Sequence, residues 1–171
     1  GGKAAQQGFA TSEPYYYENV LTDWAKPVAY QTIHAAGWTA YAQSLGGTPE
    51  NIAKYTDCLK LLVPIIQQSQ VDYVTDPSRA NALILDLVAQ FNNGWLYDAD
   101  QADAAVQFAL SEKLIANSPD GTLGSFDIDR VTAFIASAVP VYETIGAKLK
   151  ADLTAVDIVT NEFIDPTITL P

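Results

Sequence analysis

Apolar residues repeat with helical spacing through most of the chain after residue 48, and this pattern limits what the chain can fold into. Between residues 78 and 91 they recur at i, i+3, i+4, i+7, i+8 and i+11, the spacing of one face of an α-helix. An Asn-Asn-Gly sequence follows and is typical of a helix end. The sequence therefore predicts an amphipathic helix here, with the inner face Ala80, Leu83, Ile84, Leu87, Val88 and Phe91.

The same reasoning predicts helices elsewhere. Thr48-Pro49 reads as an N-cap followed by proline in the first turn, which starts a helix that runs to about residue 73 and is kinked or split at Pro64. A third helix is expected over 99–116, with alanines on its inner face. Asp127 can cap a fourth, bent near Pro140, and Thr154 with Asp157 resembles a capping box for a short last helix over 155–163.

The first 45 residues follow a different pattern. Residues 8–11 and 28–34 have the composition or alternation of short strands, with a short helix between them. Two isolated strands are marginally stable, so this pattern suggests that further strands and a second layer are missing from the chain. The predicted fold class is α-rich α/β, with a few short strands and five to six helices. Residues 1–45 form the strand-bearing region and 46–171 the helical one.

Charge and composition exclude several functions. Twenty acidic against nine basic residues give a formal charge of −11, which disfavours nucleic acid and anionic membranes as partners. Cys58 and His34 are the only residues of their types, so metal sites built on cysteines or histidines are excluded, and Cys58 is expected to be a buried, inert thiol. Phosphate-loop and hydrolase motifs are absent. The prediction is a protein that is not an enzyme and has no cofactor.

The stretch GFATSEPYYYE, residues 8–18, allows two interpretations. Hydroxyls of Thr11 and Ser12, with free N–H groups at a helix start, could hold a polar ligand while tyrosine rings stack on its flat face. Alternatively, the tyrosines are core and Glu13 is a capping acid. Three adjacent tyrosines cannot all face one way on a helix, so some are expected in the core and one or two along a ligand site. Trp38 is a second candidate for an aromatic residue that lines this ligand site.

Two motifs carry a family resemblance. GFATSEPYYYE, and the C-terminal TNEFIDP at 160–166, resemble segments of type II periplasmic solute-binding proteins of ABC importers, in the nitrate/sulfonate/thiamine-precursor-like group. The resemblance covers most of this chain but about half of a typical family member, its C-terminal half. It implies a part of a periplasmic-binding-protein-like II fold, in which residues 1–45 belong to the crossover between two lobes that close on a ligand.

The resemblance also implies a function. Thr11, Ser12 and Glu13 would lie at the hinge, Tyr15 or Tyr16 would face the ligand, and Trp38 would line the cleft. The expected ligand is a small organic molecule or oxyanion, and the expected partners are the importer's membrane subunits. The protein would be periplasmic or extracellular, with a lipid anchor as one option for the full-length protein, and the chain alone could form a homodimer through uncovered apolar surface. The alternative function is a self-contained helical module that binds a protein partner.

Overall fold

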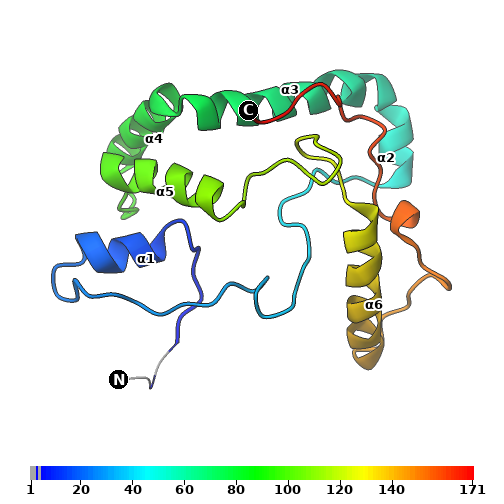
Figure 1. The fold of residues 1–171 in the computed structure, drawn as a ribbon, viewed down its shortest axis with the longest axis horizontal. Helices are drawn as coiled ribbons and strands as arrows, with labels where there is room; N and C mark the ends of the chain where they lie inside the picture. The colour runs from blue at the N-terminus through cyan, green and yellow to red at the C-terminus, as the bar shows by residue number, and fades with distance from the viewer. Residues whose placement is uncertain (1–2, 4) are drawn as a thin grey trace. The chain divides into compact units, whose positions relative to one another are not determined.

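The structure, a computed structural model, describes residues 3 and 5–171 (Figure 1). Its regular elements are all helical. In chain order they are α1 (Glu13–Tyr15), the π-helical η1 (Tyr16–Val20), α2 (Pro49–Lys54), α3 (Thr56–Thr75), α4 (Ser78–Phe91), α5 (Ala99–Ser111), α6 (Ile128–Thr144) and the 3₁₀ turn η2 (Ala155–Asp157).

The predicted α/β fold class is wrong, because the described residues contain no β-strand and no sheet. Their only β-type pairing is an isolated bridge between Asn117 and Leu123. A periplasmic-binding-protein fold needs a central sheet, so that expectation is overturned as well. Residues 1, 2 and 4 of the predicted strand region lie outside the described residues.

Local hydrogen bonding explains why the two predicted strands do not form. At 8–11 the chain turns at once, since the Phe9 carbonyl accepts the N–H groups of Ser12 and Glu13 at 2.9 and 3.1 Å. At 28–34 the N–H of Val28 donates to the Glu18 carboxylate at 2.9 Å. A strand needs a neighbouring backbone for its N–H and C=O groups, and alternation of side chains alone does not provide one.

Three predicted helix starts are confirmed by their caps. The Thr48 hydroxyl accepts the Asn51 N–H, the Asp127 carboxylate accepts the N–H groups of Asp129 and Arg130, and Thr154 with Asp157 forms the capping box. Each bond satisfies a backbone donor that has no partner inside its helix. The predicted end of α4 is also confirmed, because Asn92 adopts the left-handed conformation.

Several helix boundaries differ from the prediction. The first long helix breaks at Tyr55, while Pro64 lies inside the continuous α3. Helix α5 ends at Ser111 rather than near 116, and the last predicted helix is reduced to the single turn η2. Cys58, expected to be buried, is exposed.

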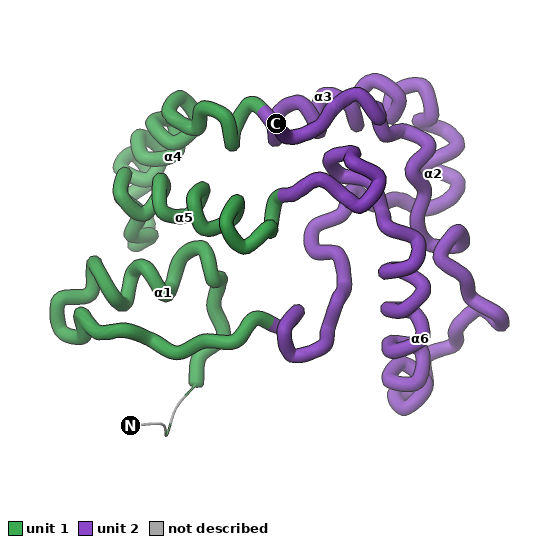
Figure 2. Tube along the Cα trace, viewed as in Figure 1, with its two compact units in different colours: residues 1–32, 72–115 green, residues 33–71, 116–171 purple. Residues whose placement is uncertain are grey.

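The chain divides into two compact units, each formed by two stretches of sequence (Figure 2). Unit 1 comprises residues 1–32 and 72–115, and unit 2 comprises 33–71 and 116–171. The division into 1–45 and 46–171 stays a prediction. The units are described separately below.

Unit 1 is built around the inner face of α5. Ala102, Val106 and Ala109 are buried, so small side chains make the contact surface of this helix. The sequence predicted Ala102, Ala105 and Ala109 on this face, and Ala105 is half-buried. The apolar stripe of α4 is only partly covered, and Phe91 at its end is 73% exposed. The predicted periodicity is correct, but the expected burial of the whole stripe is not.

Unit 2 is connected by three amide side chains that each bond to backbone groups of a distant segment. The buried Gln67 of α3 donates to the carbonyl of Leu123 at 2.7 Å and accepts the N–H of Asp165 at 2.9 Å. The Asn161 side chain likewise donates to the carbonyl of Phe126 and accepts its N–H. The Asn117 side chain does the same with the carbonyl and N–H of Leu170. These amides take the place of a ladder of backbone hydrogen bonds.

We predict that Gln67→Ala destabilises the protein by about 2–3 kcal/mol, because it leaves the buried carbonyl of Leu123 and the half-buried N–H of Asp165 without partners. Urea unfolding followed by circular dichroism measures the change. The control Gln70→Ala removes an exposed side chain of the same type from the same helix. Equal stability of the two variants would contradict the role given to Gln67.

Candidate functional site

The Glu-Pro-Tyr segment begins with a tight turn that uses Glu13 internally. The Glu13 carboxylate accepts the N–H of Phe9 at 2.6 Å. It folds over Gly8 so closely that a Cβ at that position would lie 2.7 Å from the carboxyl carbon of Glu13. A larger residue at position 8 would therefore displace the Glu13 carboxylate from its bond to Phe9. The Glu13 carboxylate thus closes the turn before α1, and no side chain caps the start of that helix, so the expectation that Glu13 is a capping acid is not met.

Ser12 and Tyr15 lie against the start of α5. The Gln101 side chain, only 2% exposed, donates from Nε2 to the Ser12 hydroxyl at 3.0 Å. Partial burial, followed by the nearby carboxylates of Asp100 and Asp98, raises the pKa of Tyr15 above its usual 10.0. The structure thus brings two of the predicted site residues to one place, the acidic first turn of α5.

The other predicted site residues lie elsewhere. Thr11 is half-buried in the turn before α1. The Tyr16 ring meets the edge of Tyr17 at 6.0 Å, and its carbonyl closes the π-helical turn by accepting the Leu21 N–H. Trp38 belongs to unit 2, where it is 39% exposed and contacts the Phe134 ring edge-to-face at 4.9 Å. A role for these three residues in ligand binding stays a prediction.

Unit 1 adds further rings and a polar pair to the region around α5. Trp95 and Tyr97, just before the helix, stack at 5.3 Å with an interplanar angle of 20°. At the end of α3, the Tyr73 hydroxyl donates to the Asn81 side-chain oxygen at 3.0 Å. Burial raises the pKa of both Tyr73 and Tyr97, and the Asp103 carboxylate raises both further.

We call the following residues of unit 1 the α5 face, although Asn81 among them is buried: Ser12, Tyr15, Tyr73, Asn81, Trp95, Tyr97, Asp98, Asp100 and Asp103. Its rings offer flat apolar contact area, its carboxylates accept hydrogen bonds, and its tyrosine hydroxyls donate or accept them. Such a combination suits recognition of a small solute. It contains no nucleophile–base pair and no basic residue.

Sequence reasoning missed most of the α5 face. Trp95 and Tyr97 carried a usable signal, since residues two apart in an extended connection point the same way. Asp98, Asp100 and Asp103 have the composition of an ordinary acidic helix start, and Asp98 does cap α5 by accepting the Gln101 N–H at 2.8 Å. The pairing of Tyr73 with Asn81 spans a turn between two helices and has no recognisable pattern.

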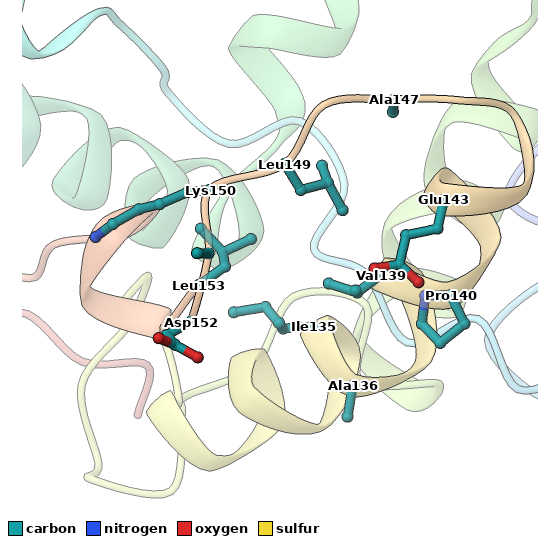
Figure 3. A pocket seen from close by; sticks show the side chains of 11 residues that line it. Ile135, Ala136, Val139, Pro140, Glu143, Ala147, Leu149, Lys150, Asp152 and Leu153 are labelled. Atoms are coloured by element: carbon teal, nitrogen blue, oxygen red, sulfur yellow. The ribbon is translucent and has the colours of Figure 1, made fainter.

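Unit 2 has a separate hollow of about 440 Å³ between α6 and the segment 147–153 (Figure 3). Ile135, Val139, Leu149 and Leu153 give it an apolar lining, and Glu143 and Asp152 are among its charged residues. Lys150, also in the lining, forms an ion pair with Asp157. None of the residues predicted to bind ligand lines this hollow.

The described residues contain no group of three or more His, Cys, Asp or Glu side chains placed to hold a metal ion. Over the same residues, no helix is both long and apolar enough to cross a membrane.

Comparisons with models of protein families, with curated protein sequences and with solved structures found no match to this chain. The resemblance to solute-binding proteins therefore stays a hypothesis that depends on its two motifs.

We predict that Asp103→Asn lowers the pKa of Tyr73 and Tyr97 toward the usual value, because it removes a nearby negative charge that disfavours phenolate. The shift is partial, since burial makes the larger contribution at both tyrosines. The pKa of each tyrosine is measured by NMR during titration with base, with the tyrosines labelled at the ring carbon that bears the hydroxyl. Asp129→Asn on α6 removes an equal charge in unit 2, and an identical effect of both variants would contradict the prediction.

We also predict that Asp157 makes a contribution to the stability of the folded protein that is lost in acid. Its bonds to Lys150, and then to the backbone and hydroxyl of Thr154, lower its pKa from 3.8 to about 2. A lowered carboxyl pKa in the folded state stabilises the protein above the unfolded pKa, and this contribution is lost as pH falls through the folded value. Asp157→Asn should therefore lower the urea midpoint at neutral pH, with a difference from wild type that shrinks between about pH 4 and pH 2.

The neighbouring Asp152→Asn is the control, because asparagine accepts the left-handed conformation that Asp152 adopts. A pH-independent difference for Asp157→Asn would refute the assignment.

Proposed function

We propose that this chain acts in solute capture, as part of the solute-binding component of an ABC import system for a small organic or oxyanion ligand. The observation that carries the proposal is the position of the Glu-Pro-Tyr motif. Tyr15 of that motif and the preceding Ser12 lie against the start of α5, beside rings and carboxylates suited to hold a small solute.

The proposal does not depend on the sheet-containing fold that the resemblance implied. It depends on the chemistry of the α5 face. Aromatic side chains provide stacking surface at low entropic cost, and a few placed polar groups give orientation and specificity. The buried Gln101 supports this arrangement, since its side chain fixes the Ser12 hydroxyl at the edge of the face.

Partners and location follow from the same proposal. A solute-capture component of an importer works outside the cytoplasmic membrane and delivers its ligand to the importer's membrane subunits. We therefore propose a periplasmic or extracellular protein, anchored by lipid if the full-length chain carries an anchor. Self-association through exposed apolar side chains such as Leu61 and Phe91 is a further hypothesis, and a sedimentation run that shows only monomer would remove it.

One observation favours the alternative, a self-contained helical interaction module. Residues 38–41 pack on the start of α6: Arg130 donates to the carbonyl of Thr39 at 3.0 Å, and Tyr41 accepts the N–H of Asp127 at 3.0 Å. Residues 38–41 therefore contact a helix, and the described part of the N-terminal region has no open strand edge. Such a module would bind a protein and no small solute.

The deciding experiment measures solute binding by the full chain. The probes are nicotinamide for flat neutral heterocycles, methanesulfonate for oxyanions and choline for organic cations. We expect at least one probe to raise the melting temperature with a saturable concentration dependence, because a ligand that binds only the folded state stabilises it. The same probe should change tryptophan fluorescence.

Two variants locate the binding. Tyr15→Ala should weaken binding of the active probe, while Tyr55→Ala, which removes an exposed tyrosine from unit 2, should leave it unchanged. If no probe class shifts the melting temperature or the fluorescence, solute capture is rejected and the interaction module becomes the better explanation. Equal weakening by both variants would reject the α5 face as the binding surface.

A further inference from the structure

The chain contains a single Asn-Gly pair, Asn93-Gly94, which lies in the connection between α4 and α5. An asparagine before a glycine can lose ammonia without any enzyme, when the backbone nitrogen of the glycine attacks the side-chain amide carbon. Glycine permits this attack because it has no side chain to obstruct the approach. In a folded protein the reaction also requires a glycine N–H that is not held in a hydrogen bond, and access for water.

The structure leaves this pair open. Asn93 and Gly94 are both exposed, and the N–H of Gly94 donates to no acceptor among the described residues. Apart from the chain neighbours of Gly94, no atom lies within 4 Å of the place that a Cβ would take there. The nearby side chains of Phe91 and Trp95 are 73% and 56% exposed. The attacking nitrogen is therefore free, and solvent reaches the connection.

The side chain of Asn93 is turned along the chain toward its own attacker. Its Oδ1 accepts the N–H of Trp95 at 3.3 Å. This bond runs from a residue to the second residue after it, so it folds the amide group of Asn93 back over Gly94. A hydrogen bond accepted by Oδ1 also draws electrons away from the amide carbon, which favours attack at that carbon.

A chemically related pair, Asp120-Gly121 in unit 2, shows the opposite arrangement. The N–H of Gly121 donates to the carbonyl of Ser118 at 2.8 Å. The Asp120 carboxylate accepts the N–H of Thr122 at 2.9 Å, and the Ser125 hydroxyl contacts its two oxygens at 2.9 and 2.8 Å. These bonds lower the pKa of Asp120, so the group stays a carboxylate, which is a poor target for attack. Nucleophile and target are both held in place at this position.

We propose that Asn93 is a site of spontaneous deamidation and isoaspartate formation in the folded protein. The Gly94 nitrogen gives its proton to solvent and forms a bond to Cγ of Asn93. The bond from Cγ to Nδ2 breaks, and the nitrogen leaves as ammonia with a proton from water, so a cyclic succinimide remains. Water then adds to one of the two ring carbonyl carbons. Addition at Cγ reopens the ring to aspartate, and addition at the backbone carbonyl carbon reopens it to isoaspartate.

The modification changes the surroundings of Trp95. Either product places a new negative charge beside this ring. Isoaspartate also adds one carbon to the backbone and turns the former side-chain carbonyl into part of the main chain, so the bond from the Trp95 N–H to Oδ1 is lost. We expect the stack of Trp95 on Tyr97 to loosen as a result. The modification does not depend on solute capture, so each proposal can fail without the other.

The first test follows the folded full chain during incubation in mildly alkaline buffer below its melting temperature. Digestion and mass spectrometry with fragmentation locate the exchange of –NH₂ for –OH, and an isoaspartyl methyltransferase with labelled S-adenosylmethionine counts the isoaspartate. We expect Asn93 to react while Asn92 stays intact, because the residue after Asn92 carries a side chain. Samples digested at time zero correct for reaction during the digest.

The second test places the same dipeptide in both settings of one chain. Asp120→Asn creates a second Asn-Gly pair, whose glycine N–H is held by Ser118. We expect this pair to react about tenfold or more slowly than Asn93-Gly94 in the folded protein, because its reaction waits for local opening of several hydrogen bonds. In urea the two positions should react at similar rates. Circular dichroism checks that the variant is folded.

A blocking variant links the chemistry to the ring. Asn93→Gln lengthens the side chain by one carbon, which disfavours ring closure, so it should abolish both the mass change and any drift of tryptophan fluorescence during incubation. If folded wild type keeps Asn93 intact while the chain in urea deamidates, the site is protected and the inference is overturned. Equal rates at the two positions of folded Asp120→Asn overturn the role given to the free Gly94 N–H.

Discussion

The buried amide of Gln67 is the interaction on which the arrangement of unit 2 depends. It bonds to Leu123 and to Asp165, which lies 98 residues away along the chain. Without a sheet, the loop at 116–126 and the C-terminal segment have few backbone partners of their own. Amide side chains can replace a peptide group because they offer both a donor and an acceptor in one plane. Asn161 and Asn117 use the same geometry on neighbouring segments, so the unit is held by polar side chains more than by a large apolar core.

This dependence gives the two resemblance motifs a local physical role. In TNEFIDP, Asn161 bonds to Phe126, Phe163 is buried, and the Asp165 carboxylate accepts the N–H of Thr167 at 2.9 Å. In GFATSEP, Gly8 makes room for the Glu13 carboxylate that caps the turn. Residues of both motifs are thus explained by folding alone. Only Ser12 and Tyr15 connect a motif to the α5 face, and the proposed function depends on those two residues rather than on the whole match.

The parts predicted correctly from the sequence are those set by residues close together in the chain. Caps at Thr48, Asp127 and Thr154 involve donors within three residues, and the end of α4 at Asn92 follows from one left-handed residue. The strands failed because pairing is a non-local property, and alternation over 28–34 says nothing about a partner. The α5 face was missed for the same reason. Tyr73, Asn81 and Asp103 lie on three different helices, and only packing brings their polar groups together.

The small core of unit 1 and its exposed rings have a common origin. Helix α5 presents alanines and one valine to its neighbours, which permits close helix contact but buries little apolar area per residue. The larger aromatic residues, Trp95 and Tyr97, precede the helix and lie outside that contact, where they stack on each other. Because small residues fill the inside of the unit, Trp95 and Tyr97 lie outside that contact, next to the acidic residues at the start of α5. A surface built in this way gains little stability from its rings and carboxylates, and the buried Asn81 amide, whose Nδ2 has no hydrogen-bond partner among the described residues, adds a cost of about 1–3 kcal/mol.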